Sequence, residues 1–346
     1  MPEARSWVLH VDLDQFIAAV EVLRRPELEG LPVVVGGRGD PTERGVVATA
    51  SYEAREHGVG SGMPLRTAAR KLPDEAVFLP SDHAAYDEAS AVVMDTLRSF
   101  GVPVQVLGWD EAFLAVETDD PEAFAAQVRA RVLERTRLHC SVGIGDNKLQ
   151  AKIATGFGKP RGVGCLTTEG WFDVMGDRPT EALWGIGRKT ARKLAELGIV
   201  TVRDLAETSA QELADRLGPT MGPWFRRLGR GVDSSAVDAT PYVNRGHGRE
   251  TTFQENLTDW ELVAGAVRTL AAQVSADIAA EGRPAVRVGM KLRYAPFETR
   301  TRSLTLPAPT SDASVIADAA VELLGRFDRS RAVRLVGVRA EMQDPA

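Results

Sequence analysis

The chain has 346 residues, enough for several domains at roughly 100–200 residues each. Its hydrophobic fraction of 44% is ordinary for a globular protein, and no run reaches the ~18 consecutive apolar residues that a membrane-spanning helix needs. Residues 1–6 lack the apolar core of a secretory signal, and the cysteines, Cys140 and Cys165, match no metal-ligand spacing. We therefore expect a cytoplasmic protein with reduced thiols.

The net charge of −6 is unevenly distributed along the chain. Residues 1–147 carry 14 Lys and Arg against 24 Asp and Glu, a net charge of −10, whereas residues 148–232 carry 14 against 9, a net charge of +5. An acidic first part suits a cation site, and a basic later part suits contact with phosphates. Ordinary solvated faces would give a similar distribution, so charge alone does not decide between these interpretations.

Apolar patterning predicts the secondary-structure elements in chain order. The run at 7–13 predicts a buried strand, and a helix follows from residue 16 until Pro26 limits it. Further strands are expected at 32–36, 45–50, 104–109, 112–116 and 139–145, and helices at 51–57, 65–71, 82–100, 121–137 and 146–156. Residues 171–228 predict short helices only, and residues 231–244 lack periodicity. From residue 245 onward the strands return, at 286–294 and 333–341, with helices at 259–281 and 311–327.

The order strand, helix, strand, strand, helix, strand, with an insertion after the first strand, predicts a ferredoxin-like layer of helices on a sheet. The chain is therefore expected to be an α/β multidomain protein. It would contain a split α/β domain with a small inserted domain, then a helical domain, a linker and a terminal α/β domain.

Three carboxylates form the expected chemical centre. Asp12 lies near the end of the first strand, and Asp110 and Glu111 lie at the junction of two later strands. In the predicted sheet the first and third strands are neighbours, so these carboxylates meet. Their repulsion favours a bound cation, and oxygen ligands suit Mg²⁺ or Mn²⁺. Two such ions roughly 4 Å apart can clamp the attacking and leaving oxygens of phosphoryl transfer. The alternative is that Asp12 and Asp14 cap the helix that follows them.

Four motifs in order resemble those of the Y-family DNA polymerases, and their spacing resembles the DinB-like DNA polymerase IV branch. They are the sequences VDLDQFIAAVE at 11–21, ATASYEAR at 48–55, WDEAFL at 109–114, and GDNK at 145–148 with KPRG at 159–162. The resemblance implies a right-hand polymerase with a ferredoxin-like palm, small fingers, a helical thumb with a helix-hairpin-helix, and an α/β little finger. The implied domains are a palm at 1–15 and 82–168, fingers at 16–81, a thumb at 169–232, a linker at 233–244 and a little finger at 245–341.

The resemblance also implies which residues form the site. Asp12, Asp110, Glu111 and the carbonyl of Leu13 would bind two Mg²⁺ ions, with Mn²⁺ as a possible substitute. The nucleotide triphosphate would contact Phe16, Ile17, Thr49, Tyr52, Arg55 and Lys159. A local pairing of Arg55 with a glutamate and simple core packing of Phe16 are the structural alternatives. None of the five histidines has ligand spacing, so we expect all five to be structural or exposed.

Ile17 departs from the family pattern, because the family usually has Phe or Tyr at this position. That aromatic ring lies beneath the incoming sugar and excludes a 2′-hydroxyl. Isoleucine is shorter and not planar, so we expect this enzyme to accept ribonucleotides as well as deoxyribonucleotides. The alternative is that a β-branched side chain still blocks the hydroxyl. Gln15 also departs from the family, and the sequence suggests no role for it.

Basic and glycine-rich segments are expected to bind primer–template DNA. Gly185, Gly187, Arg188 and Lys189 resemble a helix-hairpin-helix, which holds a phosphate on backbone amides without reading sequence. Gly218 to Gly222 resembles a second such turn more weakly. The further candidates belong to the terminal domain, where alternation lets several of them share one sheet face: Arg245, Arg287, Lys291, Arg293, Arg300 and Arg302. Solvated basic faces are the alternative for both groups.

Three other functions are alternatives to template-directed polymerisation. A catalytically dead accessory protein predicts a lost carboxylate triad, but all three carboxylates are present. A nucleotide cyclase would not explain the helical and basic domains, and a plain DNA-binding adaptor is distinguished by primer extension. The family further implies translesion synthesis with low fidelity, low processivity and no proofreading. We expect a monomer, and residues 341–346 show no clear clamp-binding peptide.

Overall fold

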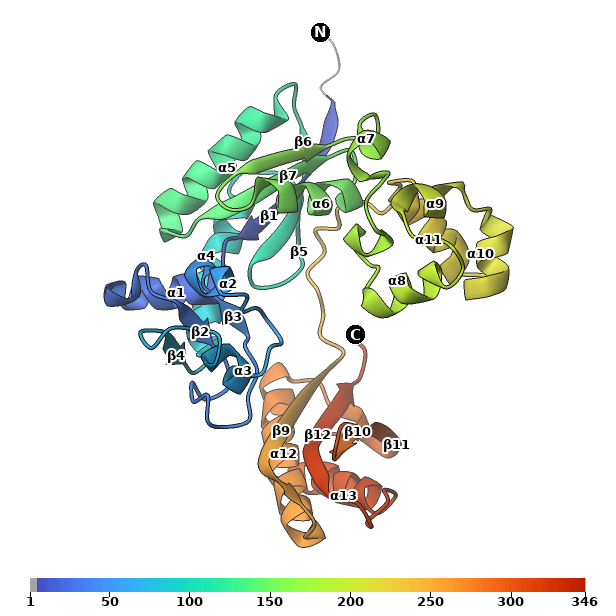
Figure 1. The fold of residues 1–346 in the computed structure, drawn as a ribbon. Coiled ribbons are helices and arrows are strands. Elements are labelled where there is room, and N and C mark those ends of the chain that lie inside the picture. Colours follow the sequence, from blue (N-terminus) through green and yellow to red (C-terminus); the bar gives the residue numbers. More distant parts are fainter. Residues whose placement is uncertain (1–4, 346) are drawn as a thin grey trace. The chain divides into compact units, whose positions relative to one another are not determined.

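We describe the protein from a computed structural model, which describes residues 5–345 (Figure 1). Residues 1–4 and 346 lie outside the described residues. The expectations for the two chain ends depend in part on these residues. The chain divides into two compact units, one of Met1–Pro41 with Gly45–Pro241 and one of Thr42–Arg44 with Tyr242–Ala346. Each unit has its own hydrophobic core.

A five-stranded sheet in the order β5–β6–β1–β7–β8 forms the centre of the first unit. Its strands are β1 (Ser6–Leu13), β5 (Val104–Val106), β6 (Glu111–Glu117), β7 (Cys140–Gly145) and β8 (Val163–Leu166). Because β1 lies between β6 and β7 and is antiparallel to both, the ferredoxin-like prediction is confirmed. Strand β8 was not predicted, since a four-residue segment containing Gly164 has little strand pattern.

The two faces of this sheet carry different kinds of residue, because side chains alternate between the faces along β1. Leu9, Val11 and Leu13 belong to the core that includes helices α4 (His83–Arg98) and α5 (Pro121–Thr136). His10 and Asp12 point to the other face, where α6 (Lys148–Gly158) packs (Figure 1). The odd positions of β1 therefore build the core, and the even positions are available for chemistry.

Glycines on β7 and β8 allow α6 to pack unusually close to the sheet. A Cβ atom on Gly143 would lie 2.0 Å from the carbonyl oxygen of Ala151, and one on Gly164 would lie 2.1 Å from that of Ala154. No side chain fits at such distances, so only glycine permits this contact between strand and helix. The close packing holds the side chains of α6 directly over β1 and β7.

The insertion after β1 forms a small three-stranded sheet with the order β3–β2–β4. Its elements are α1 (Phe16–Arg24), η1 (Pro26–Leu28), β2 (Val33–Val35), β3 (Thr49–Ala50), α2 (Tyr52–Glu56), α3 (Leu65–Ala69) and β4 (Val77–Leu79). The strand expected at 45–50 is reduced to two residues, because the segment before it makes only an isolated bridge between Val46 and Pro64. Val34, Ala50 and Leu65 are among the residues that form the core of this part.

Short helices follow, as the sequence predicted. They are α7 (Trp171–Met175), η2 (Thr180–Ala182), α8 (Arg188–Ala195), α9 (Val202–Glu207), α10 (Ala210–Leu217) and α11 (Met221–Gly229). They pack around a core that includes Trp171, Leu194, Leu205 and Phe225. No named strand occurs between residues 171 and 229, all of which the structure describes.

The second unit is a four-stranded antiparallel sheet covered by two helices. The sheet has the order β11–β10–β12–β9 and contains β9 (Gly246–Leu257), β10 (Ala285–Tyr294), β11 (Thr299–Thr310) and β12 (Val333–Met342). Helices α12 (Trp260–Glu281) and α13 (Ala313–Leu324) pack on one face, where Val288, Met290 and Leu292 are buried. The other face is open.

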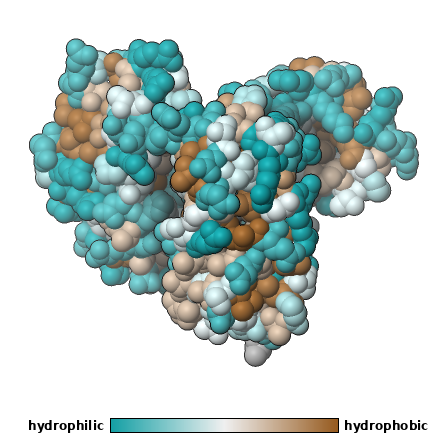
Figure 2. All heavy atoms as spheres, turned by 90° about the horizontal axis from the view of Figure 1, so that it is seen from below, coloured by the Kyte–Doolittle hydropathy of each residue, from teal (hydrophilic) through white to brown (hydrophobic). Residues whose placement is uncertain are grey.

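Hydrophilic residues predominate on the face drawn in Figure 2, with smaller hydrophobic areas between them. Helix α12 is long and apolar enough to cross a membrane by length and composition. Val263, Val267 and Val274 of this helix are buried against the sheet and α13, which is the arrangement of a core helix in a globular domain.

Candidate active site

Two of the predicted carboxylates are paired directly across neighbouring strands. Asp12 of β1 is opposite Glu111, the first residue of β6, and both side chains point to the face that α6 covers. Asp110 precedes Glu111, and its carbonyl oxygen accepts a hydrogen bond from the N–H of Leu13 at 2.8 Å. The sheet therefore brings Asp12, Asp110 and Glu111 together at the end of β1, as the sequence predicted.

Two lysines balance part of this negative charge. The Lys159 ammonium group, just after α6, forms an ion pair with Asp12, and the Lys152 ammonium group on α6 forms one with Glu111. Lys152 was not among the predicted site residues. The helix period places it one turn after Lys148, but sequence alone could not show that α6 lies against β1.

His10 is the second residue that sequence reasoning missed. It is fully buried, its Nδ1 atom lies 2.8 Å from Thr155 Oγ1, and its Nε2 atom lies 3.2 Å from Glu111 Oε2. Potential ligand atoms of His10, Asp12 and Glu111 all lie within 4.8 Å of one another. The available signal was the strand period, because His10 and Asp12 are two residues apart and so share one face.

The electrostatics of the site fit a bound cation. Burial, reinforced by the negative charges of Asp12 and Glu111, raises the pKa of Asp110 above its usual range. The hydrogen bond from His10 is the main factor that lowers the pKa of Glu111 to about 2, and Lys152 adds to the effect. Burial and the neighbouring carboxylates disfavour the ionised form of Asp110, and a divalent cation bound beside it would offset that cost.

Asp14 does not cap the helix, so that alternative is wrong. Helix α1 begins after Gln15 with no capping side chain, and the Asp14 carboxylate is only 3% exposed. It accepts hydrogen bonds from the hydroxyls of Tyr52 and Ser141, each at 2.9 Å. Asp12 does not cap α1 either, since its carboxylate pairs with Lys159.

The predicted triphosphate-contacting residues surround the end of β1. Phe16 and Ile17 form the first turn of α1, with Phe16 buried and Ile17 half-buried. Arg55 donates from Nε to the carbonyl oxygen of Ala50 at 2.9 Å, and its guanidinium lies 4.9 Å from the centre of the Tyr52 ring. Thr49 is the first residue of β3, which directly precedes α2. The stacking orders Arg55 while leaving its terminal nitrogens for another partner.

The predicted helix-hairpin-helix has the backbone that an anion site requires. Gly185 has a φ of +99°, which favours glycine, and Gly187 precedes α8 as its N-cap. Arg188 and Lys189 are exposed in the first turn of that helix. In the weaker second turn, Gly222 packs against the backbone of Leu213, where a Cβ atom would lie 2.3 Å from a carbonyl carbon. Tight packing therefore explains that glycine.

The basic residues of the second unit do not all share one face. The strand register aligns Arg293 with Thr299 and Lys291 with Thr301, so Arg287, Lys291 and Arg293 lie on the open face. Arg300 is opposite buried Leu292, and Arg302 is opposite buried Met290. These two side chains therefore point to the helix-covered side, where the Arg302 guanidinium lies 5.7 Å from the ring of Phe327. Arg245 is exposed just before β9.

A ferredoxin-like sheet with clustered carboxylates at the end of its central strand is an arrangement that suits metal-dependent nucleotidyl transfer. Comparisons with known proteins support this class. Residues 11–156 match the impB/mucB/samB family, residues 244–343 match the C-terminal domain of that family, and residues 181–233 match a domain described as "DNA polymerase-iota, thumb domain".

Curated relatives extend the match to the whole chain. The chain is 50% identical to DNA polymerase IV 2 of Mycobacterium tuberculosis over 99% of its own length and 100% of the relative's. It is 40% identical to DNA polymerase IV of Methanoculleus marisnigri, covering 97% and 94% of the two chains. A solved chimera of the Y-family polymerases Dbh and Dpo4 superposes with a TM-score of 0.87 at 27% identity, over 97% of this chain and 98% of that one. The chain therefore belongs to the impB/mucB/samB family, as a DinB-like Y-family DNA polymerase.

Proposed function

We propose that this DNA-directed DNA polymerase transfers nucleotides to a primer 3′-hydroxyl by a two-metal mechanism centred on Asp12, Asp110 and Glu111. The observation that carries the proposal is the convergence of these carboxylates at the end of β1, with the pKa of Asp110 raised. The three carboxylates and the Leu13 carbonyl would hold two Mg²⁺ ions, or Mn²⁺ in their place. When bound, the ions would lower the pKa of the 3′-hydroxyl and stabilise charge on the leaving pyrophosphate.

The neighbouring side chains would bind and orient the incoming nucleotide. Tyr52 and Arg55 would contact the triphosphate, with Thr49 and Lys159 beside them, and backbone amides of Phe16 and Ile17 at the start of α1 would meet phosphate oxygens. The 3′-hydroxyl oxygen attacks the α-phosphorus, and the bond to pyrophosphate breaks. Lys159 pairs with Asp12 in the structure, so it already lies where the triphosphate would meet the carboxylates.

Ile17 supports a wider choice of sugar. Its half-buried position in the first turn of α1 leaves a branched aliphatic side chain where the family usually places an aromatic ring. We propose that the enzyme uses rNTPs as well as dNTPs, because isoleucine fills less of the space that a 2′-hydroxyl would enter.

Primer–template DNA would be held by two kinds of surface. The Gly185–Gly187 turn and exposed Arg188 and Lys189 would bind one backbone phosphate region. In the second unit, Arg245 and the open-face residues Arg287, Lys291 and Arg293 would contact further phosphates. Arg300 and Arg302 lie on the other face, so we leave them out of this surface.

The remaining family properties complete the proposal. Ternary complexes of Dbh with its substrates are among the solved relatives, one of them at a TM-score of 0.67 and 27% identity. They support primer–template DNA and a nucleoside triphosphate as its partners, and we propose that the enzyme is monomeric and cytoplasmic. We propose low-fidelity, poorly processive translesion synthesis without proofreading. The domain ranges given from the sequence, a palm at 1–15 and 82–168 with fingers at 16–81 between them, are part of the same proposal.

Primer extension with each nucleotide type tests this function. The wild-type enzyme is given a DNA primer–template with dNTPs or rNTPs, in Mg²⁺ and in Mn²⁺, beside Asp110→Ala. Extension with both sugars that is lost in the variant supports the whole proposal. Extension with dNTPs alone would retain the mechanism and reject the role of Ile17.

A further inference from the structure

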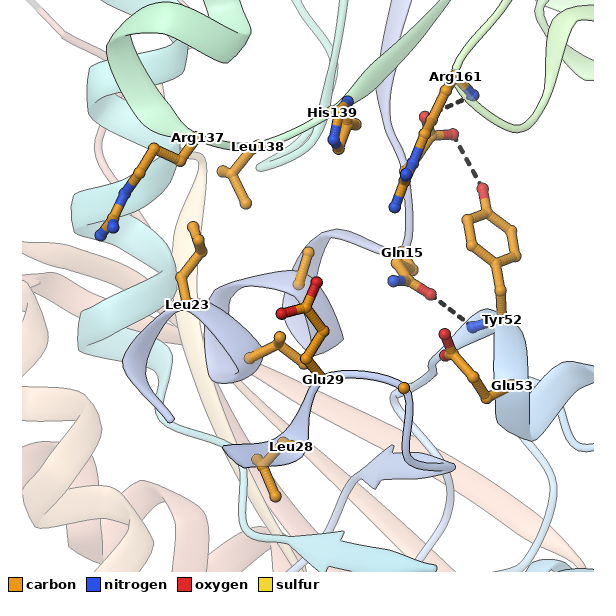
Figure 3. Close-up of a pocket in the computed structure, with 14 residues that line it drawn as sticks. Gln15, Leu23, Leu28, Glu29, Tyr52, Glu53, Arg137, Leu138, His139 and Arg161 are labelled. Carbon is orange, nitrogen blue, oxygen red and sulfur yellow. Dashed lines mark hydrogen bonds between the residues drawn. The ribbon is translucent and has the colours of Figure 1, made fainter. Parts of the chain in front are cut away.

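Tyr52, the first residue of α2, is held at two points by two adjacent residues that follow β1 (Figure 3). The side-chain oxygen of Gln15 accepts a hydrogen bond from the backbone N–H of Tyr52. The Asp14 carboxylate accepts one from the Tyr52 hydroxyl at 2.9 Å. Burial raises the pKa of Tyr52, so the phenol keeps its proton and is the donor.

The Gln15 contact satisfies a backbone N–H at the start of α2 that the helix cap leaves unpaired. Ser51 caps α2 by accepting from the N–H of Ala54, which leaves the N–H of Tyr52 without a partner inside its own helix. Gln15, which lies just before α1, supplies that partner. The start of α2 is thereby attached to the end of β1 by a side chain for which the sequence suggested no role.

Asp14 connects this contact to the segment that carries Lys159. Besides Tyr52, its carboxylate accepts hydrogen bonds from the Ser141 hydroxyl on β7 and from the backbone N–H of Arg161, both at 2.9 Å. Arg161 lies two residues after Lys159. One buried carboxylate therefore joins β1, β7, α2 and the segment after α6.

Backbone strain is concentrated at the same place. Gln15, Arg137 and Arg161 are the non-glycine residues with positive φ in the described part of the chain, at +46°, +59° and +56°. All three line one cavity of about 370 Å³ behind Tyr52 (Figure 3). Such conformations persist where surrounding contacts fix them, and they are concentrated at functional sites. For Gln15 and Arg161, the hydrogen bonds to Tyr52 and Asp14 are those contacts.

We propose that Gln15 and Asp14 are positioning residues for nucleotide binding. They fix the start of α2 against the end of β1, so that Tyr52 and Arg55 face the triphosphate from one side while Lys159 faces it from the other. This inference rests on the proposed triphosphate role of those three side chains. Loss of the Gln15 acceptor frees the start of α2, and a displacement of about 1 Å at a substrate-positioning group is enough to impair an enzyme.

Gln15→Met tests the proposal, because methionine has nearly the same length but cannot accept the Tyr52 hydrogen bond as an amide oxygen does. The KM for a single dNTP is expected to rise about tenfold, while kcat stays within about threefold of wild type and the unfolding temperature falls by no more than a few degrees, as the loss of one hydrogen bond allows. Gln127→Met, the same change at an exposed position on α5, is the matched control and should leave KM unchanged. A KM for Gln15→Met within twofold of wild type would overturn the proposal.

Arg55→Ala separates this inference from the function on which it rests. If Arg55→Ala leaves the dNTP KM unchanged, the proposed triphosphate contact fails, and the positioning role fails with it. If Arg55→Ala raises KM but Gln15→Met does not, only the positioning role fails. In a Tyr52→Phe Arg55→Ala background, Gln15→Met should raise KM by less than in wild type, since the groups it positions are gone. If Gln15→Met raises KM by the same factor in both backgrounds, Gln15 does not act through Tyr52 and Arg55.

Discussion

The close packing of α6 on the sheet depends on a glycine at position 143, and Gly143→Ala measures that dependence. The added Cβ atom would lie 2.0 Å from the carbonyl oxygen of Ala151 and 2.3 Å from the backbone nitrogen of Thr155. Both are backbone atoms, so no rotamer change relieves the clash. To reach even a 3.0 Å contact, the helix must move away from the sheet by about 1 Å at this point.

The expected magnitude follows from this displacement. Overpacking a core by one methyl group usually costs about 1–3 kcal/mol, and a clash with helix backbone belongs at the upper end, so we expect a loss of about 3 kcal/mol in the free energy of unfolding. The same movement pulls Thr155 and Lys152 away from His10 and Glu111. Primer extension should therefore fall more than a purely global loss of stability would explain.

Gly156→Ala is the matched control, because it lies in the same helix and its added Cβ atom would meet no atom within 4 Å. It should raise the free energy of unfolding by about 0.5–1 kcal/mol through helix propensity. Urea unfolding followed by tryptophan fluorescence reports chiefly on the first unit, since only Trp260 of the six tryptophans lies in the second. A Gly143→Ala midpoint equal to wild type, with full activity, would refute the packing argument.

Three further predictions follow from the charges of the two units. The pKa of Asp110 is raised, so its ionisation destabilises the metal-free fold above that pKa. Asp110→Asn should therefore stabilise the protein at pH 7 in EDTA, and this gain should shrink as the pH falls through the folded-state pKa. No gain at pH 7 would contradict the raised pKa. His10→Phe removes the main factor that lowers the pKa of Glu111. As the pH falls, the variant should therefore lose activity at a higher pH than the wild type, which a pH–rate profile would show. An unshifted profile would exclude this role of His10. Arg293→Ala should weaken DNA binding and reduce the slope of log K against log salt by about 1, whereas Arg300→Ala should leave both unchanged; equal effects would contradict the assignment of faces.

The meeting of the three carboxylates could be predicted from sequence because strand ends carry strong signals. The apolar run that contains Asp12 predicts a strand. The two short strands around Asp110 and Glu111 predict a junction beside it. His10 was missed for the opposite reason: it interrupts an apolar run without ligand spacing, and its partners Thr155 and Lys152 come from a helix more than 140 residues away in the chain.

The face of the basic residues in the second unit could not be read from alternation alone. Within a strand, alternation correctly put Lys291 and Arg293 on one side. Between strands, the side that Arg300 occupies depends on hairpin register, which aligns Arg293 with Thr299 rather than with Arg300. A shift of one residue reverses every side chain of a strand, and the turn that sets this register has no decisive sequence pattern.

The most direct test of the central claim is single-turnover primer extension by variants that keep the shape of the carboxylate cluster and remove one charge at a time. Asp12→Asn, Asp110→Asn and Glu111→Gln should each lower the rate at saturating dNTP by at least about a thousandfold, with DNA affinity measured by anisotropy unchanged. Asp119→Asn, an exposed acidic residue of the same unit, should retain the wild-type rate. If any of the three cluster variants keeps a rate within tenfold of wild type, its carboxylate does not serve the catalytic cations, and the two-metal account of this site is wrong.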